Sequence, residues 1–310
     1  MIKAAMELNV SEHLFKGALT IDELAKLTES HAPSLQRLMR GLASIGIFKC
    51  NEERKWEMTP LSTILHKYFK HFSSYLLDYH VAWTSLTEVV KTGENQFEKL
   101  YGTGYWNWSN TNPKILNNVV QAYRESNEIF CSKLTDIYDF DQFEQIVDIG
   151  GNSGWLISRI LKSTKKVTGI VFDQIEVIKE AEKQKIDTKV LKRMRFVAGD
   201  ALVSVPSGGD CYTMKWVLGD FDDAAALKIL SNITNVMKKN AKLILILPVI
   251  KDDNKQNFGN FLDLEQMFLG AGHERTETEL RELLKKAGFR IERIIESGFD
   301  LCDIVEAVHE

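Results

Sequence analysis

A glycine-rich segment in the second half of the chain has the residue types of a cofactor-binding loop. Residues 147–154 read VDIGGNSG, and they lead from an expected apolar strand over 145–149 into a helix expected from Trp155. Glycines allow a sharp turn and let the backbone approach a ligand with no Cβ in the way. This pattern fits several nucleotide-type cofactors, so by itself it indicates that class of ligand without naming one.

Charged residues follow the ends of the next three expected strands. Asp173 ends the second strand, where a carboxylate can accept hydrogen bonds from both hydroxyls of a ribose. The third strand ends in Gly199, Asp200 and Ala201, which are placed to meet a purine edge, and the fourth leads into Lys215. Each signal alone fits a cap or a turn, but the four strand ends together predict a binding edge.

The elements that must position these residues begin near residue 141. Short apolar runs alternate with helical segments and predict strands over 145–149, 166–172, 195–197, 210–214, 241–247, 290–297 and 301–308. Such alternation is typical of a parallel sheet with helices on both faces. We therefore expect residues 141–310 to form an α/β domain with a doubly wound, Rossmann-like sheet.

Residues 1–140 are expected to form a separate, mostly helical domain. Thr20 and Glu23 have the spacing of a capping box at a helix start, and a second helix is expected over 30–43. Two short strands follow, which completes the pattern of a winged helix. Up to residue 60, eight basic side chains are balanced by eight acidic ones. The domain therefore lacks the positive surface that binding to nucleic acid requires.

Aromatic side chains crowd the segment between the winged helix and the sheet. They are Tyr75, Tyr79, Trp83, Phe97, Tyr101, Tyr105, Trp106, Trp108, Tyr123 and Phe130. Two interpretations stay open: these side chains form the core between helices, or some of them wall an apolar ligand pocket. The loop expected over 102–108 is the part least easily explained as core.

Composition narrows the class of protein. The 310 residues carry a net charge of −4 with a pI near 6.0. No apolar run approaches the ~20 residues that cross a bilayer. The four cysteines are scattered without a Cys-x-x-Cys pair, which argues against a disulfide framework or a zinc site. We expect a cytoplasmic protein that binds no membrane, no nucleic acid and no metal.

In order and spacing, these motifs resemble the class I S-adenosylmethionine-dependent O-methyltransferases of small molecules, such as the caffeate, acetylserotonin and bacterial natural-product tailoring enzymes. The resemblance runs from the winged helix through 148–154, 172–173, 199–200 and 215–218 to the sequence GHERT at 272–276. It implies a Rossmann-like methyltransferase sheet preceded by a mostly helical winged-helix domain, which serves for dimerisation and as a lid over the substrate.

The resemblance also implies roles along the predicted binding edge. Gly150 would face the methionine part of S-adenosyl-L-methionine, and Asp173 would bind its ribose. Asp200 and Ala201 would hold the adenine, and Lys215 would lie beside the cofactor. The implied partners are a small aromatic or polyketide-like acceptor and either a second copy of the chain or a larger biosynthetic assembly.

The departures from the family pattern concern the catalytic base. Where the family has a histidine that deprotonates the acceptor hydroxyl, this chain has Gly219, and a carboxylate that orients the histidine appears as Ile244. The second orienting position is still acidic, as Glu274. Two further side chains are candidate substitute bases: His80 on the aromatic helices, and Asp220 next to the missing histidine.

Two smaller departures accompany the missing histidine. Asn152 stands where the family usually has a glycine. Family members also usually carry a further helix before the residues that match the start of this chain, which indicates a piece of a longer protein or assembly.

Three functional hypotheses follow from these observations. A general base supplies roughly 10²–10⁴-fold in rate, so its loss matters least for an acidic phenol, enol or carboxylate acceptor. The first hypothesis is O-methylation of such an acceptor with a non-standard or substrate-supplied base. The second retains the fold and cofactor for non-methylating chemistry, such as that of a pericyclase, a decarboxylase or a hydroxylase. The third is a catalytically silent binding module, against which the complete set of cofactor residues counts.

Overall fold

The computed structural model describes residues 1–69, 73, 78–251, 253, 255, 257–298 and 301–310. The contacts divide the chain into two compact units, Met1–His80 with Gln121–Glu125, and Val81–Val120 with Ser126–Glu310. The boundary expected near residue 140 marks the change to strand–helix alternation, whereas the contacts group most of the helices before it with the sheet. Among the described residues, no helix is both long enough and apolar enough to cross a membrane.

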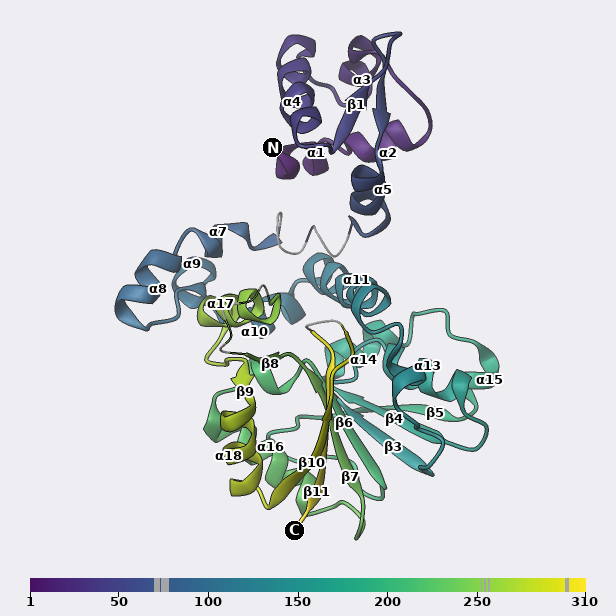
Figure 1. Cartoon of the computed structure of the whole chain (residues 1–310), viewed down its shortest axis with the longest axis vertical. Helices are drawn as coiled ribbons and strands as arrows, with labels where there is room; N and C mark the ends of the chain where they lie inside the picture. Colours follow the sequence, from purple (N-terminus) through teal and green to yellow (C-terminus); the bar gives the residue numbers. More distant parts are fainter. Residues whose placement is uncertain (70–72, 74–77, 252, 254, 256, 299–300) are drawn as a thin grey trace. The chain divides into compact units, whose positions relative to one another are not determined.

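The first unit has the predicted winged-helix pattern (Figure 1). Its elements are α1 (Ile2–Glu7), α2 (Val10–Phe15), α3 (Ile21–Leu27), α4 (Ala32–Ser44), β1 (Phe48–Cys50), β2 (Trp56–Met58) and α5 (Pro60–Lys67). Thr20 and Glu23 form the predicted capping box, since each side chain accepts from the other residue's backbone N–H. β1 and β2 pair antiparallel, and Phe48 and Trp56 are buried in one apolar core with residues of α3 and α4.

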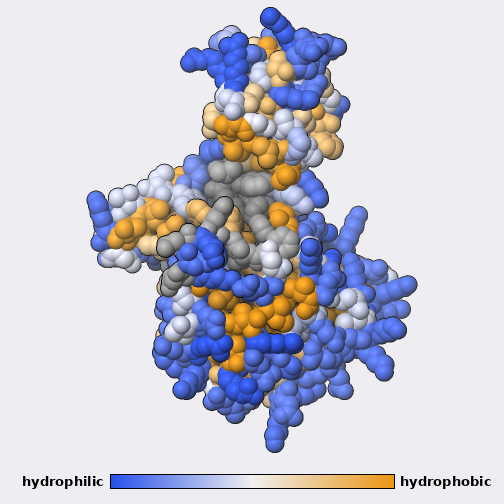
Figure 2. Space-filling view, in the orientation of Figure 1, coloured by the Kyte–Doolittle hydropathy of each residue, from blue (hydrophilic) through white to orange (hydrophobic). Residues whose placement is uncertain are grey.

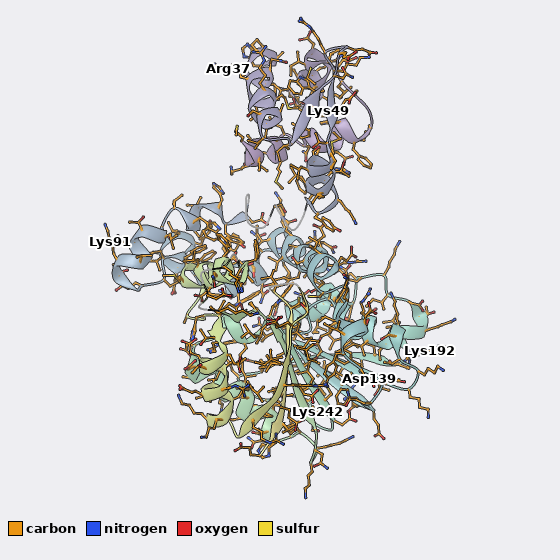
Figure 3. The ribbon with its side chains drawn as sticks, in the orientation of Figure 1. Arg37, Lys49, Lys91, Asp139, Lys192 and Lys242 are labelled. Atoms are coloured by element: carbon orange, nitrogen blue, oxygen red, sulfur yellow. The ribbon has the colours of Figure 1, made fainter. Side chains whose placement is uncertain are left out.

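Charged side chains of both signs lie on the surface of the first unit. Figure 3 labels two exposed basic residues, Arg37 on α4 and Lys49 on β1. Lys49 forms an ion pair of 3.0 Å with Glu57 across the wing. This pairing agrees with the balanced charge of the sequence.

Short helices lead from the first unit to the sheet. They are α7 (His80–Trp83), α8 (Leu86–Thr92), α9 (Phe97–Tyr101), α10 (Tyr105–Thr111), α11 (Pro113–Phe130) and α12 (Leu134–Ile137). Of the aromatic residues singled out in the sequence, Tyr75 and the side chain of Phe130 lie outside the part of the chain that the structure describes.

The aromatic side chains of α9 and α10 pack on one another. Phe97 is fully buried, and its ring stacks on that of Tyr101 with centroids 4.3 Å apart. The same ring meets Tyr105 and Trp108 edge-on at 5.6 and 5.5 Å. The loop expected over 102–108 is wrong in part, because α10 begins at Tyr105. In α9 and α10 these rings therefore pack on one another as core side chains, as the first of the two interpretations predicted.

Seven strands form the sheet of the second unit (Figure 1). They are β3 (Gln145–Ile149), β4 (Thr168–Asp173), β5 (Met194–Ala198), β6 (Cys211–Lys215), β7 (Lys242–Leu247), β10 (Phe289–Ile295) and β11 (Asp303–His309). The spatial order is β10-β11-β7-β6-β3-β4-β5. β3 to β7 are parallel as predicted, but β11 lies antiparallel between β10 and β7. The connection from Ile295 to Asp303 is too short for the crossover that parallel neighbours need.

Helices pack against both faces of this sheet. The remaining elements are α13 (Trp155–Ser163), α14 (Ile175–Ala181), α15 (Thr188–Leu191), η2 (Leu218–Asp220), α16 (Asp223–Thr234), β8 (Val249–Ile250), α17 (Gly259–Leu269), β9 (Arg275–Thr276) and α18 (Glu277–Lys286). In β7, Leu243, Leu245 and Leu247 share an apolar cluster with α16 and α18. Ile244 and Ile246 share the opposite cluster with α13. A strand buried on both faces therefore reads as a continuous apolar run.

A buried carboxylate ties together the edge of the sheet that contains β7, β10 and β11. Glu306 on β11 accepts hydrogen bonds from Tyr138 Oη at 2.6 Å, Lys242 Nζ at 2.7 Å and Arg293 Nη2 at 2.9 Å. Figure 3 labels Lys242 at the start of β7. Burial by itself would raise the pKa of Glu306, but the hydrogen bonds from Lys242, Tyr138 and Arg293 outweigh it and lower that pKa to about 2.

Replacing this carboxylate is expected to destabilise the fold. Glu306→Gln leaves two cationic partners without their anion and should lower the free energy of unfolding by about 2–3 kcal/mol at neutral pH. Because the folded-state pKa is lowered, the stabilisation is full above the ordinary carboxyl pKa and disappears as pH falls through about 2. Urea unfolding at several pH values measures both effects.

A matched control lies on the neighbouring strand. Glu292 is exposed and pairs only with Arg290 at 3.0 Å among the described residues, so Glu292→Gln should change stability by no more than ~0.5 kcal/mol. Equal effects of the two substitutions would contradict the assigned role of Glu306.

Candidate functional site

The predicted binding residues meet at one edge of the sheet because the parallel strands end in register. Ile149 at the end of β3 pairs with Phe172 of β4 and with Met214 of β6. Asp173, the last residue of β4, pairs with Ala198 at the end of β5. The ends of these four strands and the loops that follow them carry all five predicted cofactor residues. They therefore open at the same carboxyl edge, where ligands bind in sheets of this kind.

The glycine loop after β3 requires its glycines for two physical reasons. Gly150 has a left-handed φ of 68°, and a Cβ on it would lie only 2.4 Å from Cγ2 of Val217. The N–H groups of Gly150 and Gly151 both donate to the carbonyl oxygen of Phe172, at 2.8 and 3.1 Å. These hydrogen bonds fold the loop back onto the end of β4. The absence of a Cβ on Gly150 lets its backbone pack against Val217 at the carboxyl edge of the sheet.

Asp173 is held by backbone groups and retains the capacity to bind hydroxyls. Its Oδ2 accepts from the N–H of Asn152 at 2.9 Å, and its Oδ1 accepts from the N–H of Gln174 at 2.7 Å. Burial raises its pKa to about 6, against the opposing effect of these two hydrogen bonds. Each carboxylate oxygen has a second lone pair, so the group can still accept from two ribose hydroxyls.

Asn152 fits the position that a glycine usually takes in the family. Its φ is 50°, a left-handed conformation that asparagine adopts more easily than most residues. Its Oδ1 is buried, and among the described residues it has no hydrogen-bond partner. The side chain therefore adds an unsatisfied acceptor beside Asp173.

The turn after β5 presents Asp200 and Ala201. Asp200 is exposed, and its Oδ1 accepts from the N–H of Leu202 at 2.9 Å. The carbonyl oxygen of Ala201 accepts from Asn232 Nδ2 of α16 at 2.7 Å. A Cβ on Gly199 would lie 2.5 Å from the ring of Phe172, so this turn also packs closely on the end of β4.

Lys215 and Asp148 bring side chains of opposite charge type to the carboxyl ends of β6 and β3. The Nζ of Lys215 lies 3.8 Å from the ring centroid of Trp216, whose indole N–H donates to the carbonyl oxygen of Leu301 at 2.6 Å. Asp148 is buried and accepts from Thr213 Oγ1 at 2.6 Å. Burial raises the pKa of Asp148 to about 7, although Thr213 and Lys215 oppose the rise. The sequence had shown Asp148 only as part of the loop motif.

These residues fit S-adenosyl-L-methionine, which is a nucleoside joined to an amino acid by a cationic sulfonium. Asp173 has free acceptor positions for the ribose hydroxyls. Asn152 Oδ1 is a buried acceptor without a donor among the described residues. The acids Asp148 and Asp173 suit a positively charged group.

Gly219 leaves no room for a side chain, such as the histidine expected from the resemblance. Gly219 is buried within η2, and a Cβ on it would lie 2.6 Å from Oε1 and 2.8 Å from Oε2 of Glu274. A Cβ on Gly272 would lie 2.0 Å from the carbonyl oxygen of Gly219. The loop before β9 therefore packs backbone to backbone against the turn after β6, and the carboxyl of Glu274 covers Gly219.

Arg275 holds these two segments together, a role that the sequence did not reveal. Its side chain is only 3% exposed. It donates from Nη1 to the carbonyl oxygen of Leu218 at 3.0 Å and from Nη2 to that of Phe221 at 3.0 Å. It also pairs with Asp223 at 2.8 Å. The sequence showed Arg275 as part of the GHERT run, but its carbonyl partners lie more than fifty positions away.

Two acids of this region have pKa values near neutrality. Burial raises the pKa of Glu274 to about 8, and the neighbouring Asp220 and Asp263 add to the rise. Burial also raises the pKa of Asp220 to about 8, against a hydrogen bond from Gln266 Nε2 to its Oδ1 at 3.2 Å. At neutral pH both groups are therefore mostly protonated and become bases only as pH rises.

The structure corrects the position expected for Ile244. This residue lies inside β7, fully buried in the apolar cluster that includes Ile146 and Ile157. The residue at the carboxyl end of β7 is Leu247, which shares a cluster with Leu218. β7 reads KLILIL, so the strand brings no acid to the edge in either case.

His273 does not lie at Gly219 as a substitute for the expected histidine base. His273 is 42% exposed and lies 3.9 Å from Asp223. His80 is the first residue of α7, is half-buried and belongs to the first compact unit. Its role as a substitute base stays a prediction.

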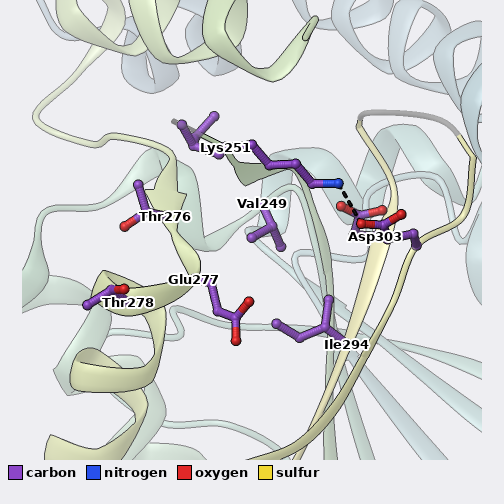
Figure 4. Close-up of a pocket in the computed structure, with 9 residues that line it drawn as sticks. Val249, Lys251, Thr276, Glu277, Thr278, Ile294 and Asp303 are labelled. Atoms are coloured by element: carbon purple, nitrogen blue, oxygen red, sulfur yellow. Dashed lines mark hydrogen bonds and ion pairs between the residues drawn. The ribbon is translucent and has the colours of Figure 1, made fainter. Parts of the chain in front are cut away.

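A separate pocket of about 270 Å³ lies beside β8, β9 and β10. Its wall includes Val249, Lys251, Glu277 and Ile294. In Figure 4 the side chains of Glu277 and Ile294 point toward each other across it, and Lys251 reaches away to its ion pair with Glu296. The wall includes none of the predicted cofactor or catalytic residues, so we do not assign it to the candidate site.

Comparison with known proteins identifies both parts of the chain. Residues 83–290 match the family model of the O-methyltransferase domain, and residues 1–68 match that of the O-methyltransferase dimerisation domain. The phenazine O-methyltransferase PhzM of Lysobacter antibioticus is 32% identical, over 98% of this chain and 90% of that protein.

Solved structures agree with this match. The crystal structure of LaPhzM has a TM-score of 0.94 at 32% identity and covers 100% of this chain and 94% of that one. The O-methyltransferase NcsB1 from neocarzinostatin biosynthesis was solved with S-adenosyl-L-homocysteine and 1,4-dihydroxy-2-naphthoic acid. It has a TM-score of 0.85 at 25% identity and covers 100% of this chain and 95% of that one. The chain therefore belongs to the O-methyltransferase family of S-adenosylmethionine-dependent methyltransferases that includes natural-product tailoring enzymes.

Proposed function

We propose that this methyltransferase transfers the methyl group of S-adenosyl-L-methionine to an oxygen of a small aromatic or polyketide-like acceptor without a histidine base. The observation that carries this proposal is the covered Gly219. The carboxyl of Glu274 occupies the space of a side chain there, while the loops after β3 to β6 keep their binding groups. The acceptor half of the site thus departs from the family pattern at the expected base, whereas the cofactor half departs from it only at Asn152.

The cofactor is assigned to five residues at the sheet edge. Gly150 brings backbone close to the methionine part, and Asp173 accepts from the ribose hydroxyls. Asp200 and Ala201 border the adenine, and Lys215 lies beside the cofactor. The register of the four strand ends and the free acceptor positions of Asp173 support this assignment.

The class of acceptor follows from methyl transfer without a histidine base. The cofactor supplies an electrophilic methyl group, so the acceptor oxygen must be nucleophilic when it reaches the site. Acidic phenols, enols and carboxylates meet this condition most easily, because little driving force is needed to remove their proton. The phenazine and dihydroxynaphthoic acid in the names of the related proteins are aromatic compounds, which supports an aromatic acceptor.

We assign the interface of a homodimer to the first unit. Large apolar side chains are exposed on it, among them Phe15 at 60%, Leu61 at 51% and Ile64 at 48%. Figure 2 shows apolar surface on this unit. Exposed apolar side chains of this kind mark protein interfaces, and the match to a dimerisation domain supports the same partner. We place the dimer in the cytoplasm, where its four free cysteines would stay reduced.

A direct test of the function uses isotopically labelled cofactor. The purified chain is incubated with methyl-labelled S-adenosyl-L-methionine and a panel of phenols, enols, polyketide thioesters and, for comparison, simple alcohols. Mass spectrometry should find the label on an acidic aromatic or enolic oxygen and not on the alcohols, whose protons are too strongly held. Label on none of the acceptors, with cofactor still bound, would favour non-methylating chemistry.

The role of Asp173 is tested by calorimetry with S-adenosyl-L-homocysteine. Asp173→Ala should weaken binding roughly 10- to 100-fold, the scale of a lost hydrogen bond to a charged group. Glu182→Ala, which removes an exposed acid after α14, should leave the affinity unchanged. Unchanged affinity in both variants would remove Asp173 from the cofactor site.

Restoring the family histidine tests whether the acceptor half has been rebuilt. In Gly219→His the new side chain must displace the carboxyl of Glu274, so turnover of the acceptor found in the panel should fall at least ~10-fold. The affinity for S-adenosyl-L-homocysteine should change less than ~3-fold, because the cofactor loops are untouched. A large gain in rate would instead mean that the protein merely lacks its usual base.

A further inference from the structure

We infer that Glu274 itself removes the proton of the acceptor, with its carboxyl in the position where a side chain at residue 219 would begin. The inference rests on the proposed methyl transfer and deepens it. In the family this carboxylate orients a histidine, whereas here no histidine stands between Glu274 and the space above Gly219. The acidic residue therefore changes from a positioning residue to the one that touches the acceptor.

The carboxyl of Glu274 is placed and free for this task. Its oxygens would lie 2.6 and 2.8 Å from a Cβ on Gly219, so they fill the volume from which a side chain at that position would start. The residue is 8% exposed. Among the described residues, no hydrogen bond to its side-chain oxygens is found, although buried carboxyls nearly always have one. An acceptor hydroxyl is the kind of donor that would satisfy it.

The backbone that carries Glu274 is fixed on both sides. The N–H of Glu274 donates to Asp263 Oδ1 of α17 at 2.9 Å. The next residue, Arg275, is bonded to the carbonyl oxygens of Leu218 and Phe221 on either side of Gly219. The carboxyl and the glycine are therefore held in one rigid arrangement, as proton transfer at a fixed distance requires.

The charged groups that face Glu274 are mostly acidic. They are Asp220 after β6, Asp263 and Glu265 on α17, and Arg275 on β9. Burial and the acidic neighbours raise the pKa of Glu274 to about 8, and Arg275 lowers it only in part. A carboxylate with this pKa is a far stronger base than an ordinary one, and it suits a phenol.

The proton and electrons balance without a further reagent. A lone pair of the acceptor oxygen forms the new bond to the methyl carbon, and the pair of the broken carbon–sulfur bond stays on sulfur. The hydroxyl proton passes to an oxygen of ionised Glu274, which becomes a neutral carboxylic acid. Glu274 returns this proton to water after the products leave.

The experiment is a pH–rate profile on an acceptor whose own hydroxyl has a pKa near 10. In the wild type, kcat/KM should rise about tenfold per pH unit and level off near pH 8, where Glu274 is ionised. In Glu274→Gln only the ionised acceptor reacts. The break in the profile, which is the pH at which kcat/KM levels off, should therefore move to about pH 10. The rate at pH 8 should fall by roughly 10²–10⁴-fold.

Two further variants separate Glu274 from its rival Asp220. Glu274→Asp retains a carboxyl and should keep a break below pH 10 with a reduced kcat. Asp220→Asn removes a group that raises the pKa of Glu274, so its break should stay but shift to lower pH. A break that survives Glu274→Gln and disappears in Asp220→Asn would overturn the inference and make Asp220 the base.

Calorimetry with S-adenosyl-L-homocysteine shows whether each variant is folded and loaded. Glu274→Gln should bind it as the wild type does, because Glu274 lies outside the cofactor set. Wild-type turnover together with an unchanged break near pH 8 in Glu274→Gln would remove Glu274 from proton transfer but leave the methyl transfer standing. No methylated product from the wild type would instead overturn the proposed function itself.

Discussion

The approach of two backbones, the loop before β9 and the turn after β6, is the constraint on which the candidate site depends. A Cβ on Gly272 would lie 2.0 Å from the carbonyl oxygen of Gly219, so only glycine lets the segments touch. Such close packing of two backbones buries carbonyl groups that need donors. Arg275 supplies them to Leu218 and Phe221 from a guanidinium that is almost fully buried. Arg275 thereby fixes the turn after β6, and with it Gly219.

This arrangement places most of the predicted cofactor residues and the proposed acceptor side on different segments of the chain. The cofactor residues Gly150, Asp173 and Asp200 are positioned by loops after β3, β4 and β5, which bond to one another across Phe172 and Asp173. The acceptor side depends on Gly219 and Glu274, which lie on the turn after β6 and the loop before β9. Lys215 lies only four residues before Gly219, so a change at Gly219 spares the loops after β3, β4 and β5 but alters the turn after β6.

Burial also gives the carboxyl edge its electrostatic character. The pKa of Asp148 is raised to about 7, that of Asp173 to about 6, and those of Asp220 and Glu274 to about 8. In each case desolvation is the first cause, and hydrogen bonds or cations only reduce it. At neutral pH, Asp173 is therefore mostly ionised, Asp148 is about half ionised, and Asp220 and Glu274 are mostly protonated. A nearby cation favours the ionised form of each group, which suits a sulfonium cofactor. They can also exchange protons with an acceptor near neutral pH.

The sequence by itself determined the features that depend on near neighbours. The capping box at Thr20, the bounds of β3 and the left-handed glycine at 150 follow from residue types within a few positions. The order of strand-end residues was enough to predict the parallel sheet and its cofactor edge. It was not enough for β11, whose direction depends on a short connection, or for the α10 aromatics, which pack as core.

Only the tertiary structure decided what surrounds Gly219. The resemblance led us to expect a histidine at position 219, but the sequence could not indicate that the carboxyl of Glu274 fills this space or that Arg275 holds both segments. It also misplaced Ile244, because position along a strand does not tell how far a side chain lies from the edge. These contacts join residues more than fifty positions apart. Their distances and pKa values arise from burial and packing, which exist only once the chain has folded.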